Sequence, residues 1–349
     1  MTSLTLGATR TAGWLRGPGF DLGFIAGTAG VAFASGALVT WDARLFGPIL
    51  VLDLWLLGYH HVIATYTRLF FDRDSRERHR FLILWLPILV LGATVALAAG
   101  VGLWVLGTTY LYWQWFHYTR QSWGLSQIYR RKSGGLVTEG DLLLKATIYL
   151  VPLWGILHRS WQAPEKFLGL ELRVIPVPGL LVDIVAAAAV GAVALWTFQR
   201  LRAFWRGEGP IAHSLYMVSH LVVFAVSYLA IEDVTYGWLV VNIWHNAQYV
   251  LFVWLYNTNR FRGGVESGAR LLSSISQPGN WWRYFLFCLG VTTLIYGCLQ
   301  GVGAWLLAPG LPTLIVIYQT INFHHYIVDA LIWKVRQAPI QKTLNLPAA

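Results

Sequence analysis

The sequence has few charged residues and very few cysteines. Asp, Glu, Lys and Arg make up only 12% of the 349 residues, whereas 56% are hydrophobic. This balance excludes an ordinary soluble domain and is typical of a chain that crosses a membrane many times. The two cysteines, Cys288 and Cys298, stand ten positions apart in one apolar run, so a helix separates them by about 15 Å. They are too distant to form a disulfide, and we expect no thiolate metal site.

Phosphate-binding motifs are also missing. The nearest glycines, Gly263, Gly264 and Gly268, fit no nucleotide-binding pattern and fall in a predicted loop. A flavin or nicotinamide bound by this chain is therefore not expected, and any redox reaction needs an external electron donor.

What the sequence does contain is a succession of apolar runs of about 20 residues. They predict an all-α fold, a polytopic transmembrane helix bundle that forms one integral membrane domain over residues 1–349 with no separate soluble domain. About ten spanning helices are expected, at 20–41, 46–70, 81–99, 101–128, 141–160, 178–203, 210–231, 234–257, 284–307 and 311–335.

The distribution of lysine and arginine predicts the orientation. With the N-terminus in the cytoplasm, all but four of the 26 basic residues fall on the cytoplasmic side; the exceptions are Arg44, Arg159, Lys166 and Arg173. The positive-inside rule then places both termini in the cytoplasm. The net charge of +10 is mostly a topological signal, so no nucleic-acid partner is expected. We expect an integral protein of a bacterial inner (cytoplasmic) membrane, surrounded by the lipid bilayer.

The first apolar segment raises the question of a cleaved signal, because Ala32-Phe33-Ala34 resembles a signal-peptidase site. Its apolar run is longer than a usual signal core, and Ala26, Gly30 and Ala34 repeat every four positions, as in closely packed membrane helices. We therefore expect a retained helix that packs through these three small residues.

Eight of the ten histidines fall inside predicted spanning segments, where polar side chains are costly. Most lie at a similar depth, about 12 to 18 Å from the cytoplasmic boundary at 1.5 Å per helical residue. Polar residues recur around them at the i, i+3 and i+7 spacing of one helix face: Gln114-His117-Gln121, His213-Tyr216-His220, Asn242-His245-Tyr249 and Asn322-His325-Asp329, with Asp53 and His60 also seven apart. Stripes of this kind should face one another, so the sequence predicts one shared polar centre.

Neutral imidazoles beside a carboxylate indicate a transition-metal site, because imidazole suits iron, copper and zinc. The predicted ligands are His60, His61, His117, His220, His245, His324, His325 and Asp329. Adjacent side chains on a helix diverge by about 100°, so one member of each His-His pair should bind and the other pack. His61 and His325 are favoured, and their partners stay open.

The remaining polar residues have smaller predicted roles. Asp329, Tyr326 and Gln121 are the candidate catalytic residues, and Asn322 and Gln248 are candidates to orient the ligands. His213 is the weakest ligand candidate because it lies near the membrane surface. His79 and His158 fall outside the shared depth and are expected to be ordinary surface or interface residues.

This set of histidines on the cytoplasmic side of several helices resembles the ligand sets of membrane non-haem iron desaturases, hydroxylases and related oxygenases. The resemblance covers ligand type and location, and the HxxxH and HxxHH boxes of that superfamily are absent. It implies an iron centre with two ions that uses O2 to oxidise a hydrophobic lipid or terpenoid-like substrate. Bacterial membrane carotene-cleaving dioxygenases are similar at the same general level.

Two other classes stay open. A bis-histidine haem protein for electron transfer or quinone chemistry would use two histidines on facing helices. A transporter or proton relay would spread titratable groups from one membrane face to the other, whereas here they share one depth. The non-haem iron reading needs no further cofactor and is preferred.

The sequence indicates the class of substrate less clearly than the metal ligands. The 19 tryptophans, 16 tyrosines and 17 phenylalanines include several beside the histidines, and aromatic walls suit a long or planar apolar molecule. Packing and interfacial belts account for most of these aromatics. Arg68, Arg120 and Arg260 are candidates to receive an acidic head group at the cytoplasmic side.

Overall fold

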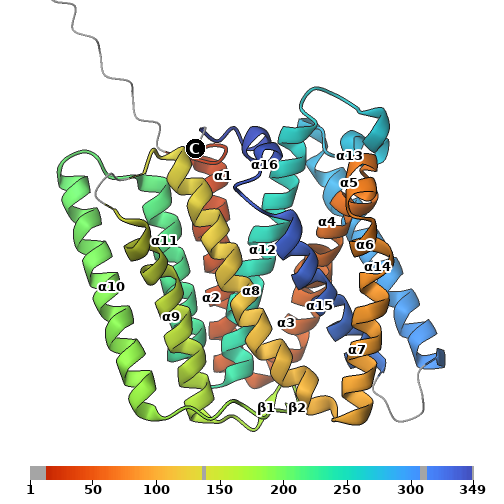
Figure 1. Cartoon of the computed structure of the whole chain (residues 1–349), viewed down its shortest axis with the longest axis horizontal. Coiled ribbons are helices and arrows are strands. Elements are labelled where there is room, and N and C mark those ends of the chain that lie inside the picture. The colour runs from red at the N-terminus through yellow and green to blue at the C-terminus, as the bar shows by residue number, and fades with distance from the viewer. Residues whose placement is uncertain (1–12, 136–138, 307–312, 348–349) are drawn as a thin grey trace, which may run out of the picture.

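The computed structural model of the chain describes residues 13–135, 139–306 and 313–347. It is a bundle of long helices that stand side by side between two end faces (Figure 1). In this described part, the only strands are β1 (Lys166–Phe167) and β2 (Leu170–Glu171), a short antiparallel pair with Lys166 opposite Glu171. The predicted all-α class is confirmed.

The helices of the first half are α1 (Pro18–Leu22), α2 (Thr28–Trp41), α3 (Phe46–Asp53), α4 (Tyr59–Phe70), α5 (Arg73–Arg78), α6 (Arg80–Leu84), α7 (Leu86–Gly100) and α8 (Leu103–Lys132). Those of the second half are α9 (Asp141–Gln162), α10 (Gly179–Trp205), α11 (Ile211–Ala225), α12 (Val234–Arg260), α13 (Arg270–Ile275), α14 (Trp281–Leu306), α15 (Thr313–Ile332) and α16 (Ala338–Thr343). Three wider π-helical turns interrupt this series: Gly23–Gly27 joins α1 to α2, Leu54–Gly58 joins α3 to α4, and Val226–Ala230 extends α11.

Six helical stretches of the described chain are long and apolar enough to cross a membrane: Pro18–Trp41, Ala43–Phe70, Asp141–Gln162, Gly179–Trp205, Ile211–Ala230 and Pro278–Leu299. This finding supports an integral membrane protein. The other predicted segments are also helical, but α7 is shorter, and α8, α12 and α15 are too polar to be counted with these six. The expected total of about ten therefore stays a prediction, as does the cytoplasmic location of the termini.

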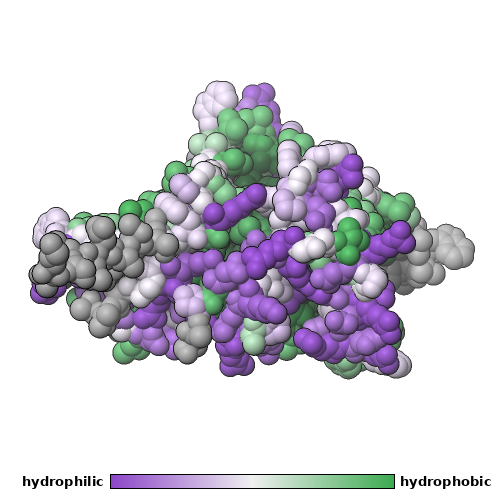
Figure 2. Space-filling view, turned by 90° about the horizontal axis from the view of Figure 1, so that it is seen from above, coloured by the Kyte–Doolittle hydropathy of each residue, from purple (hydrophilic) through white to green (hydrophobic). Residues whose placement is uncertain are grey.

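The two ends of the described chain lie at the same face of the bundle. Figure 1 shows α1, α5, α13 and α16 at one end and the β1–β2 pair at the other. Leu15 packs in one cluster with Ile340 and Leu344, so the segments that precede α1 and follow α15 are in contact. Seen from this end, hydrophilic side chains gather over the centre of the face, and hydrophobic ones show mostly around its margin (Figure 2).

The first helix packs through a different set of small residues from the one expected. Ala26, Gly30 and Ala34 are exposed, whereas Ala29, Ala32 and Gly36 are buried. A Cβ atom at Gly36 would lie 2.4 Å from Cγ2 of Val240, because α2 lies directly against α12. The helix does use small residues for a close approach, but they lie on a different face from the predicted stripe.

Helix α12 is the centre of the bundle, and nearly all of its residues are buried. It contacts α2, α4 and α11, and most of its polar side chains are buried. Because an unpaired polar group in such a place costs free energy, these side chains should find partners on the neighbouring helices. Many of those partners lie on α3, α4, α8 and α15.

Two buried arginines hold the ends of helices together. Arg200 of α10 forms a two-oxygen ion pair with Glu139, at 2.6 and 2.7 Å, and its Nη2 atom lies 2.9 Å from Nδ1 of His213. Arg159 of α9, expected in an outer connection, is also buried and donates to the carbonyl oxygens of Ser227 and Glu232 at 3.0 and 2.6 Å. His213 therefore belongs to a buried ion-pair network, separate from the other histidines.

Candidate metal centre

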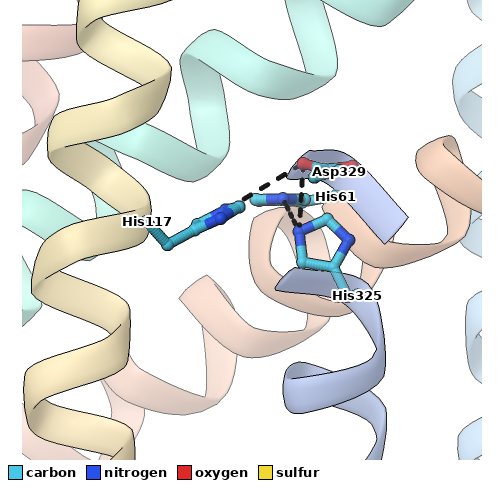
Figure 3. A group of neighbouring side chains, drawn as sticks. All are labelled: His61, His117, His325 and Asp329. Carbon is cyan, nitrogen blue, oxygen red and sulfur yellow. Dashed lines mark hydrogen bonds and ion pairs between the residues drawn. The ribbon is translucent and has the colours of Figure 1, made fainter. Parts of the chain in front are cut away.

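Four side chains from three helices meet in the interior of the bundle. They are His61 of α4, His117 of α8, and His325 and Asp329 of α15 (Figure 3). One nitrogen or oxygen of each lies within 4.8 Å of those of the other three, and all four side chains are buried. These residues are part of the predicted ligand set, and the structure brings them together from positions as far apart as 61 and 329.

The distances within this group are those of ligand atoms that face a common point. Nε2 of His61 lies 2.7 Å from Nε2 of His325, and Oδ2 of Asp329 lies 3.4 Å from Nε2 of His325 and 3.9 Å from Nε2 of His117. Nitrogen and oxygen ligands at about 2.0 to 2.2 Å from one ion are separated from each other by roughly 3 to 3.5 Å. The observed separations bracket this value, so small side-chain movements suffice to hold an ion.

A π-helical turn explains why His61 and not His60 faces the centre. In a regular α-helix, the residue seven positions after Asp53 returns to the same face, and that residue is His60. The turn at Leu54–Gly58 takes one extra residue, which moves the shared face to His61. The side chains of Asp53 and His61 both contact α12. Asp53 binds Asn242 at 2.5 Å, and His61 binds Asn246, one helical turn further on, at 2.8 Å.

On α15 the spacing alone places the site residues. His325 and Asp329 are four positions apart and share one helix face. His324 points about 100° away: its Nδ1 lies 2.7 Å from the hydroxyl of Tyr66, and its Nε2 lies 2.8 Å from the carbonyl oxygen of Leu82. Both nitrogens of His324 thus have partners outside the centre.

The outward-facing nitrogens of the two closest histidines are held by short polar side chains. Nδ1 of His61 donates to Oδ1 of Asn246, which leaves Nε2 as an unprotonated ligand atom directed at the centre. Nδ1 of His325 lies 3.2 Å from Oγ1 of Thr65. Two arrangements of protons are possible. If Nδ1 of His325 donates to the Thr65 hydroxyl, the Nε2 lone pairs of His61 and His325 face each other at 2.7 Å, and a cation is needed between them. If Thr65 donates to Nδ1, the Nε2–H group of His325 donates to Nε2 of His61. The pair is therefore suited to both a metal-bound and a metal-free state.

The carboxylate of Asp329 is oriented in the same way. Oδ1 accepts a hydrogen bond from the hydroxyl of Tyr249 at 2.7 Å and lies 3.2 Å from Oγ1 of Thr65, and Trp333 donates to the Tyr249 hydroxyl at 2.7 Å. Oδ2 is left to face His117 and His325 (Figure 3). One oxygen is held by the protein and the other is directed at the imidazoles, which is the arrangement expected of a carboxylate ligand with an outer hydrogen-bond shell.

Two imidazole nitrogens at the centre have no partner. Among the described residues, Nε2 of His117 and Nε2 of His245 are buried without a hydrogen bond. The ring of His245 lies 4.8 Å from that of His61 and 5.0 Å from that of His117, although His245 is not one of the four residues whose ligand atoms converge. Buried polar atoms without partners are costly, and a cation held by the four converging residues would give Nε2 of His117 a partner.

The other predicted site residues lie around this group or away from it. Tyr326 stacks on His117 with ring centroids 4.4 Å apart, and Gln121 lines a cavity next to the centre. His60 packs edge-on against Phe285. His220 has its Nε2 atom 3.0 Å from the carbonyl oxygen of Ile148, so it faces α9 and not the centre.

The sequence interpretation missed several residues that orient the ligands. Thr65, Trp333 and Asn246 are not among the predicted site residues, although His245, the neighbour of Asn246, is. A signal was present for two of them: Thr65 is four positions after His61, and Trp333 four after Asp329, so each pair shares a helix face. The position of Asn246 depends on how α12 is rotated, which no local pattern determines.

A cavity of about 500 Å³ reaches the centre from one side. His117, Asp329, Tyr249 and Tyr326 form the part of its wall that touches the centre, and α8 and the segment 333–336 that follows α15 provide most of the remainder. Its volume is in the range of sites for drug-sized ligands. On the opposite side, a cavity of about 20 Å³, large enough for a water molecule, is lined by polar residues that include His61, His245 and Asn242.

Comparison of the chain with protein-family models, curated proteins and solved structures finds no match. Function is therefore inferred from the chemistry of the centre and its cavity.

Proposed function

We propose that this chain is a membrane oxidoreductase that holds non-haem iron at His61, His117, His325 and Asp329 and uses O2 to oxidise a hydrophobic substrate. The observation that carries the proposal is the convergence of three imidazole nitrogens and one carboxylate oxygen at the wall of a 500 Å³ cavity. Three histidines and a carboxylate suit iron, and a cavity at the ligand atoms gives a substrate access to them.

The chain's own side chains have separable roles in this proposal. Bound iron would supply the activation of O2 and the one-electron steps that oxidation of a C–H bond requires. Asn246 and Thr65 fix the ring orientations of His61 and His325, and Tyr249 holds Asp329. The aromatic ring of Tyr326 covers His117 on the cavity side and limits the access of water to the ligand atoms.

The geometry favours a non-haem centre over a bis-histidine haem. A haem needs a flat macrocycle between two facing imidazoles, whereas His61 and His325 approach each other edge-on at 2.7 Å, with ring planes at 77°. The four converging residues supply ligands for one ion. A second ion, as expected from the sequence, would need His245 as an additional ligand.

The first test is elemental analysis and an absorption spectrum of the detergent-purified protein. We expect near-stoichiometric iron without a Soret band. Alanine variants of His61, His117 and His325 should each lose the metal, while His79→Ala and His158→Ala, which change histidines outside the bundle interior, should retain it. A Soret band, or metal content unaffected by all three ligand substitutions, would contradict the proposal.

A further inference from the structure

The 500 Å³ cavity follows one face of α8 from the centre to the end of the helix. His117, Gln121, Gly124, Ile128 and Arg131 line it at intervals of three or four residues. Fourteen residues separate His117 from Arg131, which corresponds to about 21 Å along a helix axis. The cavity is therefore long and has one end at the candidate ligands and the other among basic side chains.

The end away from the centre carries an unbalanced positive charge. Arg131, Lys334 and Arg336 line the cavity there, and within the described part of the chain none of them forms an ion pair with an acidic side chain. By contrast, Arg130 beside them is paired with Asp141 at 2.5 Å. The positive-inside rule accounts for basic residues at one membrane face, but not for three that line one end of a cavity without an ion-pair partner.

Polar atoms along the cavity also lack partners. Nη1 of Arg131, Nε2 of Gln127 and Oε1 of Gln121 are buried and have no hydrogen bond with any described residue. A guanidinium nitrogen left in this state costs free energy that an anion would recover through a charge-assisted hydrogen bond. The arrangement suits a ligand with an acidic group that binds Arg131. Any other polar atoms of this ligand would find partners in Gln127 and Gln121.

Between the basic end and the centre the walls are largely apolar. They include the aromatic side chains of Trp123, Phe252 and Trp333, and Trp113 and Phe116 continue the aromatic lining past His117. Phe116 is 47% exposed on the outer surface of α8, so this wall also reaches the side of the bundle that faces lipid. An apolar chain can therefore lie along the cavity and extend toward the bilayer.

We propose that this cavity binds an anionic amphiphile, whose carboxylate or phosphate head lies at Arg131 and Arg336 and whose apolar body extends along α8 toward His117 and Asp329. The assignment of this molecule as the substrate rests on the proposed function, but its binding does not. Neutral lipids, such as hydrocarbons and sterols, would lack the contact with the basic end.

The head group is tested by equilibrium binding to the full chain in lipid nanodiscs, with empty nanodiscs as the blank. The probes are radiolabelled hexadecanoate, hexadecyl phosphate and hexadecanol, which share one chain length. We expect hexadecanol to bind at least roughly tenfold more weakly than the better of the two anions, since a hydrogen bond to a charged group contributes about 1.5 kcal/mol or more. Whichever anion binds more tightly identifies the head as carboxylate or phosphate.

Charge variants assign the head to its residues. Arg131→Gln with Arg336→Gln should lower the affinity for the anion roughly tenfold and leave that for hexadecanol unchanged. Arg262→Gln with Arg270→Gln, which removes two exposed arginines that do not line the cavity, should change neither. Equal affinities for all three probes, or equal effects of the two double variants, would refute the head-group assignment.

A cavity-filling variant tests the location independently of charge. A Cβ atom at Gly124 would meet nothing within 4 Å, so Gly124→Phe places a ring in the cavity without a backbone clash. It should abolish binding of the anion, whereas Gly92→Phe, at an equally open and exposed position of α7, should not. Retained binding in Gly124→Phe would show that the ligand lies elsewhere.

Iron content measured on the same samples separates this proposal from the previous one. Anion binding that depends on Arg131 and Gly124 in a protein without metal upholds the ligand class and rejects the oxidation. Iron at the centre, with no preference for anions, rejects the ligand class alone.

Discussion

The hydroxyl of Tyr249 is the point at which the proposed centre can be perturbed with the least change of shape. It donates to Asp329 at 2.7 Å, accepts from Nε1 of Trp333 at 2.7 Å and lies 2.5 Å from Oγ1 of Thr65. Tyr249→Phe removes this single oxygen and keeps the ring that stacks on His61 at 4.1 Å. The substitution therefore acts on the orientation of Asp329 and not on the packing of the centre.

The expected effects follow from the bonds that are lost. Interhelical hydrogen bonds in membrane proteins contribute on average about 0.6 kcal/mol and at most about 1.7, so losing those to Asp329 and Trp333 should lower the free energy of unfolding by about 1 to 3 kcal/mol. Removing an outer partner of a metal ligand typically weakens metal affinity 10- to 100-fold. The two effects differ in kind and can be measured separately.

Tyr256→Phe provides a matched control. Tyr256 lies seven residues further along the same face of α12 and packs its ring against Trp333 at 5.0 Å, but its hydroxyl makes no hydrogen bond with a described residue. Unfolding in mixed micelles, followed by the helical signal of the metal-free protein, gives the stability, and competition with a chelator gives the iron affinity. If Tyr249→Phe matched Tyr256→Phe in both measurements, Tyr249 would not orient a metal ligand and the reasoning about Asp329 would be wrong.

Two further substitutions test the fold around the centre. Arg200→Met should lower the free energy of unfolding by about 3 to 5 kcal/mol, because it leaves Glu139 buried without its partner. Replacing both residues by apolar ones should recover most of this loss. Chemical unfolding measures the effect, with Arg73→Gln, in an exposed ion pair, as the control. Gly237→Ala should lower the unfolding temperature markedly, since its Cβ would lie 2.0 Å from a backbone carbonyl oxygen of the adjoining π-helical turn, whereas Gly30→Ala meets nothing within 4 Å and should be tolerated. A Gly237→Ala protein as stable as Gly30→Ala would show that α12 and this turn are less closely packed than described.

The position of the centre was predictable because burial restricts which faces of a membrane helix can be polar. The i, i+3 and i+7 stripes placed His117, His325 and Asp329 on inward faces, and the structure shows them in contact distance of one another. The same pattern also predicted His220 as a ligand, but its Nε2 atom lies beside the carbonyl oxygen of Ile148. A polar stripe thus predicts that a face is buried, but not which neighbouring helix it meets.

Two features could not be derived from helical periodicity. The π-helical turn at Leu54–Gly58 shifts the inward face by one residue and exchanges the roles of His60 and His61. In the first helix, the spacing of small residues fitted two faces, and the neighbour α12 selected the one with Gly36. In the first case the deciding factor is a local backbone irregularity, and in the second it is a contact with a distant part of the chain.

The same side chains that build the centre also limit how the bundle can form. Three of the four helices around it, α8, α12 and α15, are too polar to be counted among the six apolar ones, because they carry residues such as His117, Asn242 and Asp329. In lipid these groups cost free energy until they meet one another, so each of the three helices depends on its neighbours for a stable position. Helix α15, which brings both His325 and Asp329, depends on them most directly. Occupation of the centre by a cation would therefore stabilise the packing of α15 as well as supply chemistry, and the cavity between α8 and α15 would be held in shape by the same interactions.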